Sequence, residues 1–202
     1  MKSSQKGRSM VEIIGVLAII GVLSVGAIAG YATAMRKHKI NQHSHAVTYL
    51  LNTLIQMKSS FPTSTTQNTY YGDILKNMNL LPDGIKYVSN TMLRDKYFNL
   101  NMNALYYSTA RYGLLEIHFG EKADHLSDVC RGLVYAIKEN HYNLNSIQSL
   151  KTSVNNTVRT TYYGDSGCKD NTNCLARIDM SDIETLCLGC VGYSNCKIAI
   201  TY

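Results

Sequence analysis

The chain has 202 residues, of which 45% are hydrophobic and 17% are charged, and its formal net charge is +6. This composition excludes a disordered tail, and the length is sufficient for one domain of ordinary size together with a membrane anchor. Fifteen tyrosines, only two prolines and many Asn, Thr and Ser residues are typical of a compact domain that contains β-strands.

The positive charge is concentrated around one apolar block near the N-terminus. Basic residues of this kind mark the two ends of a membrane helix, and they could also contact lipid phosphates or an anionic polymer. We favour the first interpretation because the rest of the sequence has no obvious Lys/Arg cluster, and a nucleic-acid partner stays open as the less favoured alternative. The flanking residues are Lys2, Lys6, Arg8, Arg36, Lys37 and Lys39.

Residues 13–35 form an uninterrupted segment of 23 residues without a formal charge. A helix of that length spans roughly 34 Å, which is enough to cross a bilayer core. The segment is too long for the core of a secretory signal peptide, so the sequence favours an anchor that the mature protein keeps. A plain signal anchor would have the right length, but it would leave Glu12 unexplained.

Glu12 is an acidic residue at the beginning of the apolar segment. A charge in a bilayer costs a few kcal/mol even on lenient insertion scales, so an acid at such a position is usually paired and functional. Near a helix N-terminus it also gains from the helix dipole. A free α-amino group four residues upstream, in the same chain or a neighbouring one, would be a suitable partner.

Residues 7–12 read Gly-Arg-Ser-Met-Val-Glu and lead directly into the apolar segment. This pattern resembles the N-terminal motif of type IV pilins. In that family a dedicated peptidase cuts after the glycine of a short basic leader and methylates the new N-terminus, and the fifth mature residue is Glu. The resemblance implies cleavage between Gly7 and Arg8, N-methylation of Arg8 and a role for Glu12 in assembly. Two positions depart from the pattern: Arg8 replaces the usual Phe or Met, and Ala29 stands where the family often has proline.

The resemblance also implies a function and a location. The chain would be a structural subunit of a type IV pilus-like filament, of the larger type IVb-like class. It would be anchored in the inner membrane with its head in the periplasm, and extracellular after assembly. Its partners would be further copies of itself, the prepilin peptidase, the inner-membrane assembly platform and, before assembly, membrane lipid. A pseudopilin or minor pilin of a secretion or DNA-uptake machine is the alternative that shares the same N-terminus.

One helix over residues 9–58 is the economical prediction, with a hydrophobic assembly part at 8–35, an amphipathic continuation at 36–60 and a globular head at 61–202. Val47, Leu50, Leu51, Leu54 and Ile55 form one apolar face, and Pro62 ends the helix. His38, His43 and His45 do not share a helix face. We therefore expect no metal site there, and we expect these histidines to be solvated or to face another subunit.

The head is predicted to be α+β, with the long helix packed on a mostly antiparallel sheet and an extra helix. Strands are expected at 86–93, 104–112, 114–119, 154–163 and 197–202, with a turn near Tyr112-Gly113. A short helix is expected within 73–80 and a longer one at 124–139, capped by Asp124. The inner stripe of the longer helix is Leu126, Val129, Cys130, Leu133, Val134 and Ile137.

The even number of cysteines favours disulfides in an exported domain. Cys168 and Cys174 are expected to form a short bridge because they are close in sequence. A bridge from Cys130 to a C-terminal cysteine would close a loop of 60 or so residues and stabilise the fold by roughly 4 kcal/mol. The larger pilin class staples its C-terminal region in this way, and the remaining pairings stay open. The six cysteines are Cys130, Cys168, Cys174, Cys187, Cys190 and Cys196.

Cys187 and Cys190 form a CxxC motif that has two other interpretations. It could be the redox pair of a membrane-anchored periplasmic thiol oxidoreductase, or half of a zinc site. We favour structural disulfides because the motif lies in a Gly- and Cys-rich tail, without a second CxxC. Asp179, Asp182 and Glu184 could bind calcium but lack the ligand spacing of a known loop. The sequence has no P-loop, GxGxxG, HExxH or GxSxG motif, so we expect no enzyme and no cofactor.

Overall fold

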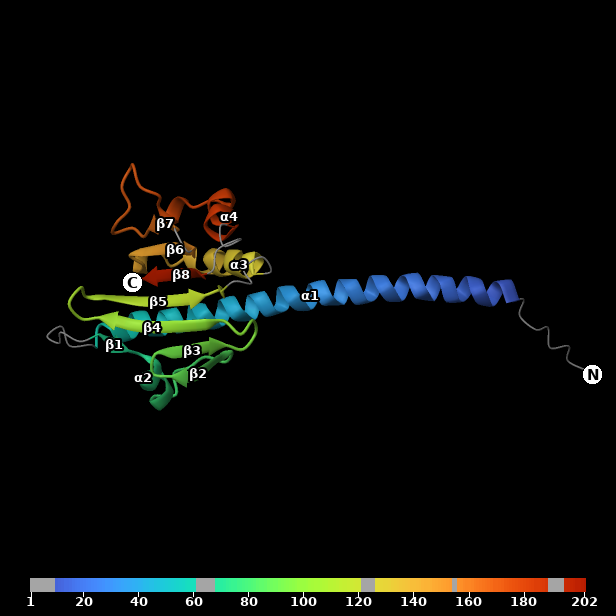
Figure 1. Ribbon diagram of the computed structural model, residues 1–202, viewed down its shortest axis with the longest axis horizontal. Helices are drawn as coiled ribbons and strands as arrows, with labels where there is room; N and C mark the ends of the chain where they lie inside the picture. Colours follow the sequence, from blue (N-terminus) through green and yellow to red (C-terminus); the bar gives the residue numbers. More distant parts are fainter. Residues whose placement is uncertain (1–9, 61–67, 121–125, 154–155, 189–194) are drawn as a thin grey trace, which may run out of the picture. The chain divides into compact units, whose positions relative to one another are not determined.

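The structure is a computed structural model that describes residues 10–60, 68–120, 126–153, 156–188 and 195–202 (Figure 1). The chain divides into two compact units, Met1–Lys39 and Ile40–Tyr202. Helix α1 (Met10–Lys58) is continuous and contributes to both units. It confirms the predicted helix up to Lys58, and the expected first residue, Ser9, lies outside the described residues. The α+β class predicted from sequence is confirmed.

The second part of α1 packs into the core of the head. Val47, Leu50, Leu51 and Leu54 are completely buried, and Ile55 is partly buried against the same cluster. This is the apolar face that the sequence predicted. Burying four such side chains stabilises the fold by roughly 1.5–3 kcal/mol each, so packing rather than helix propensity holds this part of α1 in place.

The described strands form one antiparallel sheet in the order β2-β3-β4-β5-β8-β6-β7, with β1 added beside β4. The last strand of the chain, β8, therefore lies inside the sheet, between β5 and β6. The strands are β1 (Thr69–Tyr70), β2 (Ile85–Ser89), β3 (Met92–Asp95), β4 (Asn101–Tyr107), β5 (Tyr112–His118), β6 (Ser146–Ser153), β7 (Asn156–Tyr163) and β8 (Asn195–Thr201).

The two faces of the sheet differ in character because side chains alternate along each strand. The inward side chains join the buried parts of the helices in a single hydrophobic core. Those of the four central strands are Met102, Ala104, Tyr106, Leu115, Ile117, Ile147, Cys196, Ile198 and Ile200. The outward positions carry mostly polar and charged side chains, with a small apolar cluster at Leu105, Leu114 and Ala199.

Three further α-helices are described: α2 (Gly72–Asn77), α3 (Ser127–Lys138) and α4 (Met180–Leu188). Two short 3-10 helices, His141–Asn143 and Leu175–Arg177, lie between them in sequence. The predicted inner stripe of α3 is confirmed: Val129, Cys130, Leu133, Val134 and Ile137 are buried, and Leu126 packs partly against the same core.

The capping of α3 at its N-terminus differs from the sequence prediction. Leu126 takes the N-cap position without a side-chain cap, and the predicted cap, Asp124, lies outside the described residues. The carboxylate of Asp128, in the first turn, accepts a hydrogen bond from the Val129 N–H at 2.9 Å. An acid in the first turn therefore satisfies one of the free backbone donors of this helix.

The single strand predicted at 86–93 is wrong, because this segment folds into the hairpin of β2 and β3. Ser89 pairs with Met92, so Asn90 and Thr91 form a two-residue turn. Two hydrogen bonds from α2 hold the turn in place. The Asn90 side-chain carbonyl accepts one from the Asp73 N–H, and the Asn90 backbone carbonyl accepts one from the Gly72 N–H. Asn is favoured in such turns because its side chain can replace backbone hydrogen-bond partners.

The turn predicted near Tyr112-Gly113 is also misplaced, since β4 ends at Tyr107 and β5 already begins at Tyr112. Arg111 adopts the left-handed conformation with φ 57° and closes the turn instead. Gly113 serves a different purpose inside β5, because a Cβ atom there would overlap the ring of Tyr202. Glycine is therefore required at this position for close packing and not for a turn.

Besides the two 3-10 helices, three elements were not predicted from the sequence: β1, β6 and α4. The sequence of β6, Ser-Ile-Gln-Ser-Leu-Lys-Thr-Ser, is mostly polar, although β6 pairs with a neighbour on each side. The strand predicted at 154–163 corresponds to β7, and residues 154 and 155 lie outside the described residues. The strand predicted at 197–202 corresponds to β8.

Candidate functional site

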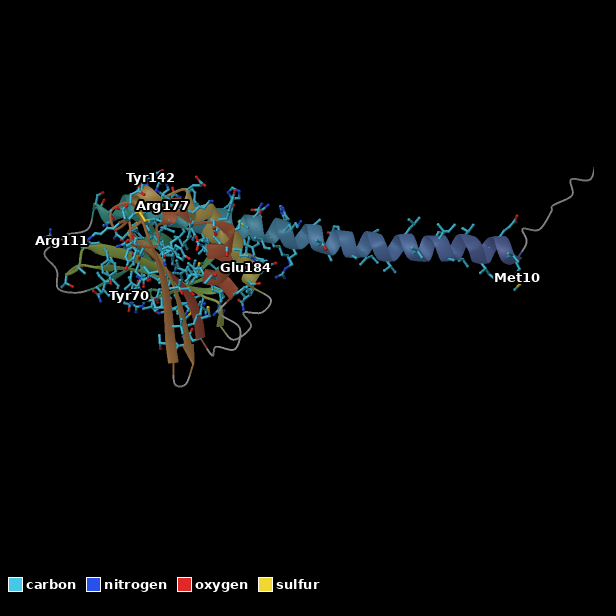
Figure 2. The ribbon with its side chains drawn as sticks, turned by 90° about the horizontal axis from the view of Figure 1, so that it is seen from above. Met10, Tyr70, Arg111, Tyr142, Arg177 and Glu184 are labelled. Carbon is cyan, nitrogen blue, oxygen red and sulfur yellow. A yellow bond between two sulfur atoms is a disulfide. The ribbon has the colours of Figure 1, made fainter. Side chains whose placement is uncertain are left out.

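The first part of α1 exposes an apolar surface on all sides, as Figure 2 shows for the helix that begins at Met10. Val22, Leu23 and Val25, in the middle of this part, are 75%, 67% and 70% exposed. Exposed apolar surface of this extent marks a site that is covered by lipid or by another protein. The other exposed large apolar residues of this part are Met10, Val11, Ile13, Ile14, Val16, Leu17, Ile19, Ile20, Ile28, Tyr31 and Met35.

Two hydroxyl side chains in this part of the helix are satisfied within the helix itself, which suits it to a medium without water. The hydroxyl of Ser24 donates to the Ile20 carbonyl at 2.7 Å, and that of Thr33 donates to the Ala29 carbonyl at 3.0 Å. In a bilayer each unsatisfied polar group would cost several kcal/mol. Among the described residues, α1 is the one helix long and apolar enough to span a membrane, although a signal sequence would meet the same test.

Small residues mark one line along this helix. Gly26, Gly30 and Ala34 follow one another at intervals of four residues, and the two glycines have nothing within 4 Å of a Cβ position. Residues four apart lie on the same helix face, where small side chains allow another helix backbone to approach closely. The line therefore offers a face for helix–helix contact.

Glu12 lies in the first turn of α1, at the N-terminal end of the apolar surface. The positive end of the helix dipole favours an acid there. Gly7 and Arg8, the predicted cleavage and methylation positions, lie outside the described residues. The structure therefore places Glu12 at the beginning of the helix, as the sequence predicted.

The three histidines of α1 do not share one environment. His38 and His45 are exposed, but His43 is completely buried. Its Nδ1 lies 3.0 Å from Oδ1 of Asp95, which is buried as well. The expectation that His43 is solvated or faces another subunit is therefore wrong, because its helix face turns toward the sheet and Asp95 supplies a partner there.

The disulfides give the C-terminal region its covalent frame. Cys130 of α3 is bonded to Cys187 of α4, with Cα atoms 5.7 Å apart. Cys168 is bonded to Cys174, as the sequence predicted, and the guanidinium of Arg177 lies beside both sulfurs (Figure 2). Cys196 is disulfide-bonded too. Cys190 lies outside the described residues.

The Cys130–Cys187 bond bears on whether the CxxC motif is a structural bridge or a redox pair. Cys187 is 1% exposed, and its sulfur is bonded to a helix 57 residues earlier in the chain rather than within the motif. A redox pair needs both of its thiols free to bond with each other and an accessible sulfur. The arrangement is that of a structural bridge, which ties α4 to α3.

The acidic group near α4 serves the helix itself. Asp179 and Asp182 cap the helix reciprocally: each carboxylate accepts a hydrogen bond from the backbone N–H of the other, at 3.1 and 2.9 Å. Asp182 also accepts a hydrogen bond from Tyr162. Burial, together with this hydrogen bond, raises the pKa of Tyr162 to about 12. Glu184 pairs with Arg131 at 2.5 Å. Among the described residues, no three His, Cys, Asp or Glu side chains form a group that could hold a metal ion.

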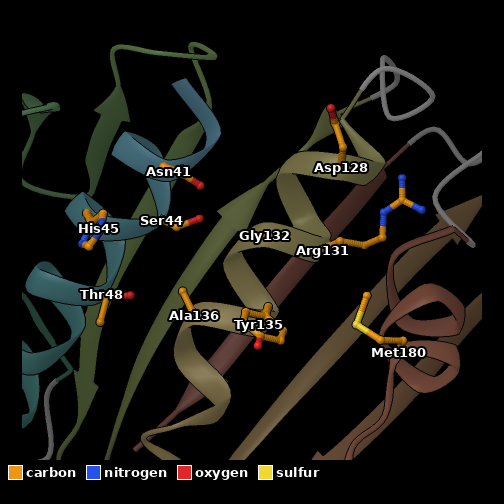
Figure 3. Close-up of a pocket in the computed structure, with 10 residues that line it drawn as sticks. All are labelled: Asn41, Ser44, His45, Thr48, Asp128, Arg131, Gly132, Tyr135, Ala136 and Met180. Carbon is orange, nitrogen blue, oxygen red and sulfur yellow. The ribbon is translucent and has the colours of Figure 1, made fainter. Parts of the chain in front are cut away.

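A groove of about 490 Å³ lies between α1, α3 and the start of α4 (Figure 3). It is narrowed where Gly132 of α3 meets α1, since a Cβ there would come 2.6 Å from the Ile40 side chain. The buried hydroxyls of Ser44 and Thr48 face it without a hydrogen-bond partner. The lining residues are Asn41, Ser44, His45, Thr48, Asp128, Arg131, Gly132, Tyr135, Ala136 and Met180.

Sequence reasoning did not single out Glu116 of β5. It lies close to two basic groups, with Oε1 2.5 Å from Lys197 Nζ and Oε2 3.6 Å from His118 Nε2. Interaction with His118 and with the closer Lys197 lowers the pKa of Glu116 to about 2, although partial burial opposes the shift. Nothing in the linear sequence pairs these residues, because β8 joins β5 only through the fold of the sheet.

In comparisons with known proteins, no protein-family model, no curated protein and no solved structure matches the chain.

Proposed function

We propose that this chain is a type IV pilin-like subunit, held in a membrane by α1 and later packed by the same helix into a filament. The observation that carries the proposal is the exposed apolar surface of residues 10–35, which continues without a break into the helix that forms the core of the head. The sequence motif around Gly7 and Glu12 supplies the reason to prefer this function over a simple membrane anchor.

The physical argument concerns what covers the apolar helix outside the bilayer. A subunit that leaves the membrane must bury this surface again or lose the hydrophobic stabilisation. Bundling the helices of many copies solves this problem, and contacts between unlike faces that do not close into a ring build an open filament. The line of Gly26, Gly30 and Ala34 would allow close helix contact in such a bundle.

Glu12 has a specific role in this proposal. In a dry bundle its carboxylate needs a positive partner, and the α-amino group that cleavage after Gly7 creates on a neighbouring copy would provide one. The prepilin peptidase and the inner-membrane assembly platform are the partners that such processing requires. The subunit would then move from the inner membrane, with its head in the periplasm, to an extracellular filament.

The main experiment compares wild-type protein with Glu12→Ala and, as a matched control, with Glu139→Ala in the head. We expect Glu12→Ala to insert into membranes at the normal level but to abolish filaments in the sheared surface fraction, while Glu139→Ala assembles normally. Filament yield at the wild-type level in Glu12→Ala would refute the assembly role.

A second measurement tests the processing. The intact mass of the mature protein should correspond to a chain that begins at Arg8, and a bulky substitution at Gly7 should leave the precursor uncut. A mature protein that still began at Met1, or that had lost residues 10–35 as a cleaved signal peptide, would contradict the proposal.

A pseudopilin or minor pilin shares every feature used so far, and abundance in the sheared filaments would separate the two. The rival from another class, a thiol oxidoreductase that uses Cys187 and Cys190, is disfavoured by the buried bond of Cys187 to Cys130. Mass spectrometry after thiol blocking tests it directly: a reactive thiol at Cys187 would favour the enzyme.

A further inference from the structure

Among the disulfides whose two cysteines are both described, Cys168–Cys174 is the accessible one. Cys168 is half-buried, and most of the residues that this short loop encloses are exposed. Cys130 and Cys187, by contrast, are 2% and 1% exposed and belong to the hydrophobic core. Thiol–disulfide exchange requires a thiolate to reach a sulfur atom. The folded chain therefore offers an external thiol the short bridge but not the long one.

A cation lies directly beside the short bridge. Nη2 of Arg177 is 3.3 Å from Sγ of Cys174 and 3.5 Å from Sγ of Cys168, and Figure 2 shows this arginine next to the disulfide. Within the part of the chain that the structure describes, no carboxylate forms an ion pair with Arg177. Its charge is therefore directed at the two sulfur atoms.

The fold holds Arg177 in this position. It is the last residue of the 3-10 helix Leu175–Arg177, and its N–H donates to the Cys174 carbonyl at 3.1 Å. The side chains of Leu175 and Ile178 are 1% and 5% exposed and anchor this helix in the core. Backbone and core contacts thus place the guanidinium beside the sulfurs, and a substitution of the exposed Arg177 side chain leaves these contacts in place.

We propose that Cys168–Cys174 is a thiol-exchange site, which a dithiol reductant opens while the chain stays folded. A thiolate of the reductant attacks Sγ of Cys168, the more exposed residue, forms a mixed disulfide with it and expels the Cys174 thiolate. The second thiolate of the reductant then attacks the reductant's own sulfur in the mixed disulfide and expels the Cys168 thiolate. Two electrons pass to the bridge, the reductant leaves as a disulfide, and each expelled thiolate takes up one of the two protons that the reductant loses.

The charge of Arg177 favours both steps. A neighbouring cation stabilises a thiolate, and a more stable thiolate leaves faster. A hollow of about 190 Å³ beside the bridge also contains the carboxylate of Asp182. Both oxygens of this carboxylate already accept hydrogen bonds, from the Tyr162 hydroxyl and from the Asp179 N–H. The group that contacts the sulfurs is therefore the cation and not the acid.

Opening the short bridge leaves the rest of the head in place. The Cys130–Cys187 bond closes a loop of 57 residues, against 6 for Cys168–Cys174. Because the stabilisation by a disulfide grows with the length of the closed loop, reduction of the short bridge costs the fold less. The long bridge still ties α4 to α3, so reduction at Cys168 and Cys174 loosens only the segment between these two residues.

The reductant must carry two thiols. After a monothiol has attacked Cys168, the thiolate of Cys174 is only six residues away and has a high effective concentration at the mixed disulfide. It therefore attacks Sγ of Cys168 again and restores the bridge. A second thiol in the same reductant competes with this return because its reaction is intramolecular as well.

This inference does not depend on filament assembly, and its test uses the full chain in a neutral detergent. The protein is treated with dithiothreitol at neutral pH, samples are blocked with excess N-ethylmaleimide at intervals, and mass spectrometry of the digested chain locates the labelled cysteines. We expect Cys168 and Cys174 to be labelled at least about tenfold faster than Cys130 and Cys187. Circular dichroism should remain native while only the short bridge is open. Equal labelling rates for the two bridges would overturn the proposal.

The role of the cation is tested with Arg177→Gln, which should slow reduction of the short bridge at least about threefold. Arg177→Lys should restore at least about half of the wild-type rate, because it keeps the charge. The matched control is Lys169→Gln, which removes the same charge from the loop itself and should react within about twofold of wild type. In concentrated urea the difference between Arg177→Gln and wild type should vanish, because the contact depends on the fold.

Two further results would overturn the proposal. A wild-type rate in Arg177→Gln, or an equal loss of rate in Lys169→Gln, would show that the guanidinium beside the sulfurs does not assist exchange. Complete reduction of the short bridge by glutathione alone, at the same concentration of thiol groups, would show that a dithiol is not required.

Discussion

His43 of α1 lies with its Nδ1 3.0 Å from Oδ1 of Asp95, the last residue of β3, and both side chains are completely buried. The other carboxylate oxygen of Asp95 accepts the Phe98 N–H at 2.6 Å. The ring of Phe98 in turn meets the His43 ring edge-on, with centroids 5.8 Å apart. The pair therefore joins α1 to the connection between β3 and β4.

We expect Asp95→Ala to lower the free energy of unfolding by about 1–3 kcal/mol, because it leaves the Phe98 N–H without its acceptor and the buried His43 ring without the carboxylate beside it. Asp95→Asn should cost less, since the amide keeps an oxygen for Phe98. Urea denaturation of the full chain in detergent measures both. The control is Asp165→Ala, which breaks the exposed contact between His141 and Asp165 at 2.7 Å and should cost about 1 kcal/mol or less. Similar losses of stability at the two sites would contradict the expectation that the buried contacts of Asp95 stabilise the fold more than the exposed contact of Asp165.

The two described disulfides should differ in their contribution to stability. Cys130–Cys187 closes a loop of 57 residues and Cys168–Cys174 closes one of 6. The chain-entropy model gives about 4 kcal/mol for the longer loop and about 2 kcal/mol for the shorter. Thermal unfolding of Cys130→Ser/Cys187→Ser and of Cys168→Ser/Cys174→Ser tests this order. A larger loss from the short loop would show that local strain or packing, rather than loop entropy, governs these bridges.

Features encoded by local periodicity could be predicted from the sequence. The helix around Leu50 and the inner stripe of α3 repeat apolar residues at helical spacing, and the closeness of Cys168 to Cys174 limits their geometry. The hairpin at Asn90 and the buried state of His43 could not be predicted, because a histidine carries no sign of which face its neighbours will cover.

The alignment of Lys86, Arg94, Lys197 and Arg159 in one row of register pairs across the sheet could not be read from the sequence for a related reason. Lys86 and Lys197 belong to strands at opposite ends of the head sequence, and they share a row only because β8 inserts between β5 and β6. Register between strands that are distant in sequence depends on the whole sheet. A search for local clusters of Lys and Arg therefore finds nothing in the head, although the folded sheet gathers these residues.

The carboxylate of Glu116 should make stability depend on pH in the acid range. Its pKa is about 2 in the folded chain, held down by His118 and Lys197, against an ordinary value of 4.5. A group whose pKa is lowered by folding stabilises the fold above its unfolded pKa, and this contribution is lost as the pH falls from about 4.5 toward about 2.

Glu116→Gln should therefore be less stable than wild type at neutral pH, and the difference should shrink toward zero near pH 2. The size of the shift sets an upper limit of about 3 kcal/mol, and the partial exposure of the partners makes the actual difference smaller. Free energies of unfolding measured across this pH range provide the test, with Glu139→Gln on the surface as the control. A difference that does not change with pH would mean that Glu116 acts through packing rather than through its charge.

Gly113 and Tyr202 lie so close together in the sheet that there is no room for a side chain on Gly113. Their backbones exchange hydrogen bonds of 2.9 and 3.1 Å, and the Tyr202 ring, 1% exposed, occupies the position that a Cβ on Gly113 would take. Gly113→Ala should displace this ring and cost about 1–3 kcal/mol. In a Tyr202→Ala background the same substitution should cost much less, because the obstructing ring is gone. Urea denaturation of the four proteins in this double-mutant cycle measures the coupling, and an equal cost of Gly113→Ala in both backgrounds would show that backbone conformation, not the Tyr202 ring, requires glycine here.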